Sequence, residues 1–145
     1  MRRKRIILAK LDSEEDNRTK AISTALRDSG CEVIYLGTGN TIDHIVNAAL
    51  QEDADAIGVS LSNYKREILP QLVSKLEESN VNDTTIFAEG NIPNKDFKYL
   101  KRRGLDKLFT LETDIKEIPK YIKTIERKER KNFFQKIYDI FFSLE

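Results

Sequence analysis

Short apolar runs alternate along the chain with longer segments in which apolar residues recur every three or four positions. The runs are typical of strands buried in a sheet, and the longer spacing is typical of amphipathic helices. We predict five strands, at residues 6–9, 32–36, 54–60, 84–88 and 107–110. We predict helices over residues 17–29, 42–51, 64–78 and 93–104, and from 115 to the end.

Within the predicted helices, the apolar positions indicate which face is buried. The first three stripes are Ala21, Ile22, Ala25 and Leu26; Ile42, Ile45, Val46, Ala49 and Leu50; and Ile68, Leu69, Leu72, Val73 and Leu76. Gly30 should end the first helix, and Thr41 should cap the second. Pro70 is tolerated only near the start of the third helix, so a helix that begins close to Pro70 is the alternative to a start at residue 64.

Strands that alternate with helices through short connections indicate a parallel sheet with helices on both faces. We therefore predict an α/β fold, Rossmann-like and flavodoxin-like, with strand order 2-1-3-4-5 and an extended C-terminal helix. Residues 1–126 should form the α/β domain, and residues 127–145 should form an amphipathic helical extension.

Composition fits a single, heavily charged globular domain: 34% of the 145 residues are charged, and the net charge is +1. We expect neither a signal peptide nor a transmembrane segment, because no apolar run approaches the ~20 residues that a membrane span needs. The lone Cys31 excludes an intramolecular disulfide, and we expect a cytoplasmic protein. We interpret the basic residues 2–5 as a solvated terminus, not as a nucleic-acid contact.

In an open parallel sheet, ligands bind outside the carboxyl ends of the strands. These ends carry mostly carboxylates and hydroxyls: Asp12, Glu14, Glu15, Asp16, Ser60, Ser62, Glu89, Glu112, Thr113 and Asp114. The first loop has no glycine, which argues against a phosphate cradle, and the third strand ends in Ser60 where a phospho-receiver domain has an aspartate. His44, on the second helix, is too far from Ser60 and Cys31 for nucleophilic catalysis.

Two interpretations of the acidic first loop stay open. Asp12 and Glu15 could act in acid–base chemistry or hold Mg²⁺ through oxygen ligands. The alternative is a solvated acidic helix start, at which carboxylates interact favourably with the helix dipole.

Five segments resemble the cobalamin (B12)-binding domain, in particular the C-terminal domain or small subunit of methylmalonyl-CoA mutase and related mutases. They are RIILAKLD, KAISTALRDSGCEVIYLG, DADAIGVSLS, FAEGNIPNKDF and GLDKLFTLETDIKEIPKYI, and the likeness spans residues 5–126. The resemblance implies a site with the signature D-x-H-x-x-G, S-x-L and G-G. In that family, the histidine is the lower cobalt ligand, the aspartate and serine support it, and the glycines leave room for the nucleotide tail.

This chain departs from the signature at most positions. The histidine position falls on Glu15 or Asp16, its aspartate partner on Ser13 or Glu14, and the loop glycine on Arg18 or Thr19. The family-equivalent positions, taken as candidate cofactor-binding residues, are Glu15, Asp16, Ser60, Ser62, Glu89, Gly90 and Thr113. A carboxylate is a harder cobalt ligand than imidazole, and Glu89 occupies a position where the tail needs bare backbone. We also expect the carboxylates to repel the anionic tail.

The sequence therefore favours a B12-binding-domain homologue that lacks the cobalt-ligating histidine and acts as a binding, regulatory or partner-docking module. Cobalamin binding is an open alternative, as in the small subunit of a mutase with non-histidine ligation. A metal-dependent enzyme that uses the acidic rim is a second alternative. The chain has no catalytic barrel, so it should not be catalytic alone; within an enzyme it would be an isomerase (mutase) subunit.

The predicted terminal helix carries an apolar face too wide for the flank of a small domain. We predict that this face contacts a protein partner or a second copy, through Phe133, Phe134, Ile137, Tyr138, Phe141 and Phe142. The alternatives are packing of this helix against the body of the domain and, third, a helix that lies on a membrane surface, although Asp139 and Glu145 interrupt its basic character.

Overall fold

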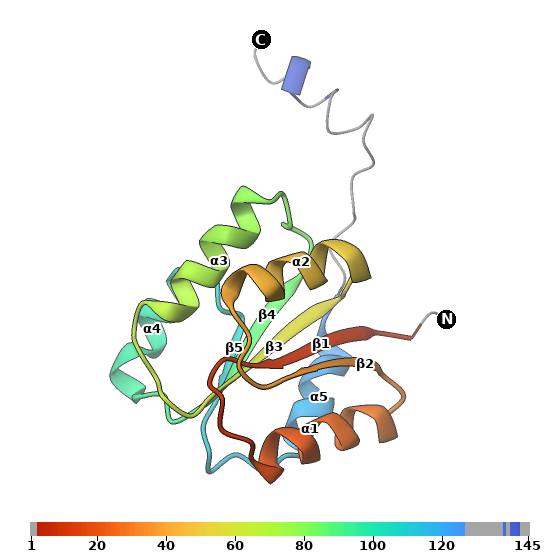
Figure 1. The fold of residues 1–145 in the computed structure, drawn as a ribbon. Coiled ribbons are helices and arrows are strands. Elements are labelled where there is room, and N and C mark those ends of the chain that lie inside the picture. The colour runs from red at the N-terminus through yellow and green to blue at the C-terminus, as the bar shows by residue number, and fades with distance from the viewer. Residues whose placement is uncertain (1–2, 127–137, 139, 143–145) are drawn as a thin grey trace.

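The sheet has the predicted architecture. The structure is a computed structural model that describes residues 3–126, 138 and 140–142. Its strands are β1 (Arg5–Lys10), β2 (Glu32–Gly37), β3 (Ala56–Leu61), β4 (Thr85–Gly90) and β5 (Lys107–Phe109). All pairings are parallel, and the order β2-β1-β3-β4-β5 confirms the prediction (Figure 1).

Helices cover both faces of the sheet, as Figure 1 shows. The helices α1 (Asn17–Asp28) and α5 (Glu117–Thr124) contact each other and pack on one face. The opposite face is covered by α2 (Ile42–Glu52), α3 (Ile68–Glu78) and α4 (Phe97–Arg102), the last preceded by a 3-10 turn, η1 (Asn94–Asp96). The strands' carboxyl ends therefore meet at one edge, between the two helical layers.

Alternate strand residues supply the two halves of the core. Ile7 and Val59 face α2 and α3, whereas Ile6 and Ala56 face α1 and α5. Every residue of β3 is buried, as expected for a strand covered on both faces. Gly58 leaves room for the Phe87 ring, since an added Cβ would lie 2.4 Å from that ring.

Two predictions about helix faces are wrong, and the alternative start of the third helix near Pro70 is confirmed. In α1, Ala21 is exposed while Thr19 and Ser23 are buried, because the first turn faces the polar end of the sheet. In α2, Leu50 is 53% exposed and Ala48 is buried in its place. The third helix begins at residue 68, not 64, and this start puts Pro70 in its first turn, where a missing N–H costs little.

The last predicted helix is not continuous. α5 ends at Thr124, and Ile125 is extended, with φ −71° and ψ 123°. The Lys4 ammonium accounts for this end, because it donates hydrogen bonds to the carbonyl oxygens of Ile122 (2.6 Å) and Ile125 (2.7 Å). Carbonyls at a helix C-terminus lack intrahelical donors, and a lysine supplies them from the start of the chain.

Part of the predicted C-terminal interface can be described. Tyr138, Phe141 and Phe142 are helical and 56%, 69% and 54% exposed. Phe133, Phe134 and Ile137 lie outside the described residues. No helix within the described ranges is long and apolar enough to cross a membrane.

Candidate functional site

The centre of the carboxyl edge is a buried lysine that the sequence analysis did not single out. Lys10 ends β1 with its side chain fully buried, donates a hydrogen bond to Asp16, and lies 3.3 Å from Asp12 Oδ1. Burial by itself would lower the pKa of Lys10, but the hydrogen bonds and charges of these two carboxylates outweigh it and raise the pKa. The lysine is therefore held charged inside the domain.

Asp12 joins the loop after β1 to the loop after β3. Its Oδ2 accepts hydrogen bonds from the backbone N–H groups of Ser62 (2.6 Å) and Asn63 (3.3 Å). Burial favours a higher pKa for Asp12, but these amides and Lys10 stabilise the carboxylate more strongly and lower its pKa. Asp12 therefore serves as a structural anion.

Asp16 caps the first helix from inside the site. Its Oδ1 accepts hydrogen bonds from the backbone N–H of Thr19 (2.7 Å) and from Thr19 Oγ1 (2.9 Å), as an N-cap aspartate does. Burial would raise the pKa of Asp16, but the bonds from Lys10 and Thr19 lower it. The Asp16 side chain is thus held by Lys10 and Thr19, although 37% of it is exposed.

Thr19, Ser60 and Glu89 continue the polar contacts across three elements. Thr19 Oγ1 lies 3.1 Å from Ser60 Oγ, which donates to Glu89 Oε2 at 2.9 Å. These three side chains are buried. The first turn of α1 therefore closes directly onto the ends of β3 and β4.

Arg18 closes the other side of the same arrangement. Its guanidinium pairs with Glu89 Oε1 and donates to the backbone carbonyls of Thr113 (2.9 Å) and Thr110 (3.3 Å). The loop after β5 is thereby tied to α1. We refer to Lys10, Asp16, Arg18, Thr19, Ser60 and Glu89 as the polar cluster.

The structure brings together some of the predicted site residues and separates others. Asp16, Ser60 and Glu89 belong to the polar cluster, and Thr113 touches it through its carbonyl oxygen. Glu15 is exposed and pairs with Lys20 on the outside of α1. Ser62 is exposed, and its contribution is the backbone N–H.

Gly90, the last predicted site position, packs against the neighbouring strand. An added Cβ there would lie 2.3 Å from the carbonyl oxygen of Leu61. A side chain is therefore excluded for a steric reason within the sheet.

Two expectations about charge need correction. The acidic rim is not a free negative surface, because Lys10 and Arg18 pair with its inner carboxylates. The open interpretation in which Asp12 and Glu15 act together is not supported, since Asp12 pairs with Lys10 and Glu15 pairs with Lys20 on the outside. Among the described residues, no group of three or more histidine, cysteine or carboxylate side chains is placed to hold a metal ion.

Sequence similarity now places this geometry in a family. Residues 4–127 match the B12 binding domain. The chain belongs to the B12-binding domain family. It is 34% identical to the 2-hydroxyisobutanoyl-CoA mutase small subunit of Aquincola tertiaricarbonis, over 75% of this chain and 82% of that one. It is 26% identical to the pivalyl-CoA mutase small subunit of Xanthobacter autotrophicus, over 87% and 86% of the two chains.

Solved structures agree at the level of the fold. A cobalamin-binding protein from Desulfitobacterium hafniense superposes with a TM-score of 0.72 at 21% identity. The match covers 86% of this chain and 59% of that protein. The predicted family resemblance and flavodoxin-like fold are both confirmed.

The residues of this B12-binding domain do not fit a corrinoid whose nucleotide tail enters the site. Asp16, one of the two positions that the resemblance gives to the cobalt ligand, is held by Lys10 and Thr19; the other, Glu15, is exposed. Thr19 and Glu89, at two glycine positions of the signature, are joined through Ser60, so side chains fill the space that bare backbone would leave. His44, the chain's single histidine, is exposed on α2.

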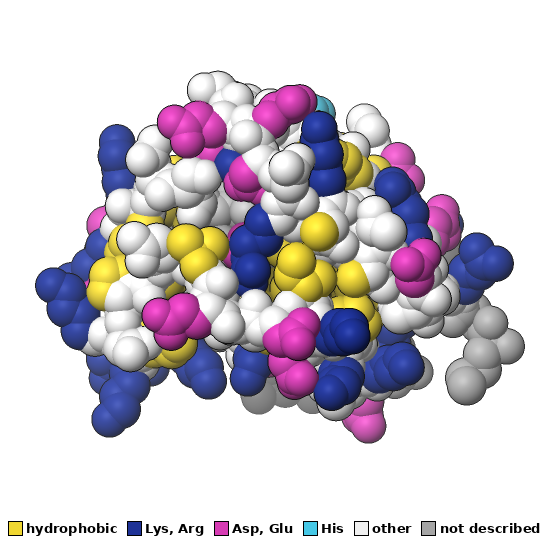
Figure 2. Space-filling view, turned by 90° about the horizontal axis from the view of Figure 1, so that it is seen from below, with side chains coloured by type: hydrophobic (Ala, Val, Ile, Leu, Met, Phe, Trp, Pro, Cys, Tyr) yellow, Lys and Arg dark blue, Asp and Glu magenta, His cyan; other side chains and the backbone are white. Residues whose placement is uncertain are grey.

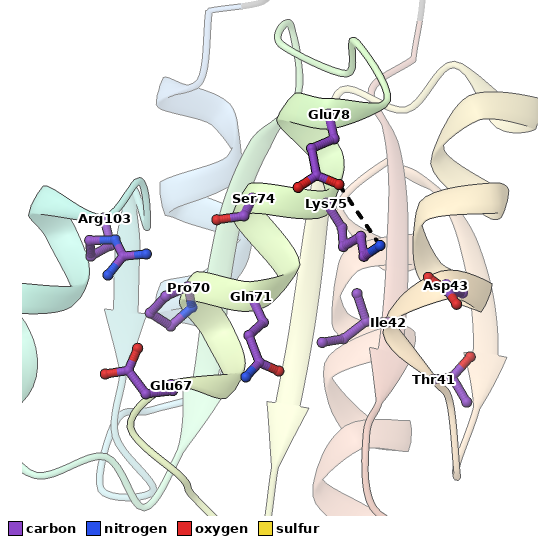
Figure 3. Close-up of a pocket in the computed structure, with 10 residues that line it drawn as sticks. All are labelled: Thr41, Ile42, Asp43, Glu67, Pro70, Gln71, Ser74, Lys75, Glu78 and Arg103. Carbon is purple, nitrogen blue, oxygen red and sulfur yellow. Dashed lines mark ion pairs between the residues drawn. The ribbon is translucent and has the colours of Figure 1, made fainter.

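Other surfaces of the molecule are more open than this edge. A groove of about 430 Å³ runs between α2, α3 and the end of α4, where Lys75 and Glu78 form an ion pair (Figure 3). On the face seen from below in Figure 1, the side of α1, Figure 2 shows charges of both signs with hydrophobic patches between them. That mixture differs from the continuous basic surface by which proteins bind nucleic acid.

Proposed function

We propose that this chain is a small subunit that docks onto a protein partner, and that it works without a histidine ligand to cobalt. The observation that carries the proposal is the match to two separate small subunits of CoA mutases over 82% and 86% of their length. Both relatives are named as small subunits, which supports a function of this chain together with a second polypeptide. The partner we propose is the catalytic large subunit of an acyl-CoA mutase.

The C-terminal aromatic residues supply a candidate docking surface. Tyr138 and Phe142 stack at a centroid distance of 4.2 Å, and both are exposed together with Phe141. Clustered exposed aromatic side chains are typical of interface hot spots, each of which contributes about 2 kcal/mol or more. We therefore assign docking to this segment.

Complex formation with a purified mutase large subunit tests the proposal. Gel filtration with light scattering should show a complex with the full-length chain, and Phe141→Asp/Phe142→Asp should weaken it by about 30-fold or more. Leu50→Asp is the matched control, because Leu50 is an exposed apolar residue on α2, and it should leave binding unchanged.

Three results would count against docking at this segment. They are a wild-type chain that stays alone, equal losses in the two variants, and no loss in either. Concentration-dependent dimers of the chain alone, abolished by the aspartates, would instead identify a second copy as the partner.

Cobalamin binding is the second candidate function, and membership of the B12-binding domain family favours it. The cobalt of a cobalamin bound here would then have no histidine ligand from this site. Retention of aquocobalamin by the wild-type chain through gel filtration would support this carrier function, whereas loss of all colour would favour docking alone.

A further inference from the structure

We infer that the polar cluster closes the site against the nucleotide tail of a corrinoid, and that Thr19, Glu89 and Arg18 determine this exclusion. The inference rests on the family membership and on the missing histidine ligand, but not on docking through the C-terminal segment.

Position is the first support for closure. Thr19 lies in the first turn of α1, Ser60 near the end of β3 and Glu89 near the end of β4. Separations of 3.1 Å and 2.9 Å between their polar atoms leave no gap between the helix and the sheet at this point. A tail that entered here would have to separate Thr19 from Ser60 and break the hydrogen bond from Ser60 to Glu89.

The second support is that Glu89 is held in place from two sides. Its Oε2 accepts from Ser60 and its Oε1 is paired with Arg18, so both carboxylate oxygens are engaged. Arg18 is itself fixed by the Thr113 carbonyl at 2.9 Å. Displacement of Glu89 would therefore remove the charged partner of the arginine that holds the loop after β5.

The third support for closure is the pairing of charges. From the sequence we expected free carboxylates to repel the anionic tail, but in the structure these carboxylates are paired with basic side chains. Lys10 and Arg18 compensate the inner carboxylates, so the closed state has little electrostatic reason to open. An entering phosphodiester would compete with Glu89 for Arg18 and leave that carboxylate buried without its partner. We therefore attribute exclusion of the nucleotide tail to the side chains of the polar cluster, which already bind one another.

Opening the site by substitution tests the inference. Thr19→Gly/Glu89→Gly removes both side chains that fill the tail space, and Thr19→Ser/Glu89→Gln is the matched control that keeps them. Each protein is mixed with excess aquocobalamin or with cobinamide, which lacks the tail, and retained corrin is measured by absorbance after gel filtration. We expect the glycine variant to retain about tenfold more cobalamin than the wild type or the control, with no gain for cobinamide.

Every other outcome overturns the inference. Stoichiometric cobalamin retention by the wild type would show that the site is open, and a folded glycine variant without gain would show that these side chains do not close it. An equal gain for cobinamide would place the effect outside the tail space. If circular dichroism shows that the double variant is unfolded, Glu89→Gly alone must give a smaller gain of the same kind. None of these measurements involves the C-terminal segment. A result that overturns closure of the site therefore leaves the docking proposal untouched, and the reverse also holds.

Discussion

Arg18→Met should destabilise the domain far more than the loss of an ordinary surface arginine. The guanidinium reaches Glu89 and the carbonyls of Thr110 and Thr113, so one side chain joins α1, β4 and the loop after β5. Methionine has a comparable apolar stem and similar helix propensity, so the substitution removes mainly the charge and the donors.

The size of the effect follows from the burial of Glu89. Its side chain is 5% exposed, and without Arg18 its remaining side-chain partner is the Ser60 hydroxyl. Removing one member of a buried ion pair costs about 3–5 kcal/mol. The Arg18 side chain is 23% exposed, so solvent screening reduces the expected loss in free energy of unfolding to about 2–4 kcal/mol.

Urea denaturation followed by circular dichroism at neutral pH measures this loss. Lys20→Met is the control on the same helix, because Lys20 pairs with Glu15 at 3.6 Å in solvent and should contribute less than about 1 kcal/mol. Arg18→Met/Glu89→Leu should be more stable than Arg18→Met alone, since it removes the unpaired carboxylate. Equal effects of Arg18→Met and Lys20→Met, or strictly additive losses in the double variant, would refute the assigned role of the pair.

Two further predictions concern the same edge. The pKa is lowered for Asp16 and raised for Lys10, so their contribution to stability should be fully present from about pH 4 to 10 and decline on either side. In acid, the decline in stability should follow the lowered pKa of Asp16. As the pH is lowered from about 7 to 2, the melting temperature of Asp16→Asn should therefore fall less steeply than that of the wild type. An equal slope for the two proteins would contradict this. Gly90→Ala should lower the free energy of unfolding by about 3 kcal/mol, because the added Cβ meets the Leu61 carbonyl oxygen. Gly39→Ala should lower it by about 1 kcal/mol, because its Cβ would have no atom within 4 Å but its φ is +67°. Equal denaturation midpoints for the two variants would contradict the steric explanation.

The fold could be predicted because its signals are local. The continuous apolar run of β3 indicated a central strand, and the structure buries all six of its residues. The end of α5 could not be found this way, since it depends on Lys4, more than 110 positions earlier in the chain. Leu50 shows a similar limit: its spacing fits the buried stripe, but the packing of α2 on the sheet selects Ala48 and Ala49 instead.

The location of the site was predictable, but its charge state was not. Ser60 and Glu89 were identified because the carboxyl ends of parallel strands converge. Lys10 was missed, and Arg18 was named only as a possible glycine position, since a sequence does not show whether a long basic side chain turns inward or into water. One signal for Lys10 was present, because it directly follows an apolar strand and precedes Leu11.

Helix capping decides which of Glu15 and Asp16 turns toward the sheet edge. Asp16 caps α1 through Thr19, and this contact turns its carboxylate inward to Lys10 while Glu15 faces Lys20 and solvent. The residue at which α1 begins therefore decides which of the two neighbouring carboxylates belongs to the site.

Titration of isotope-labelled wild-type protein with aquocobalamin, followed by backbone amide NMR, tests most directly whether the polar cluster closes the site. With the cluster closed, the amide resonances of residues 10–19, 60–63 and 89–90 should stay in place throughout the titration. Saturable shifts concentrated in those three segments, at a 1:1 ratio of cobalamin to protein, would contradict closure.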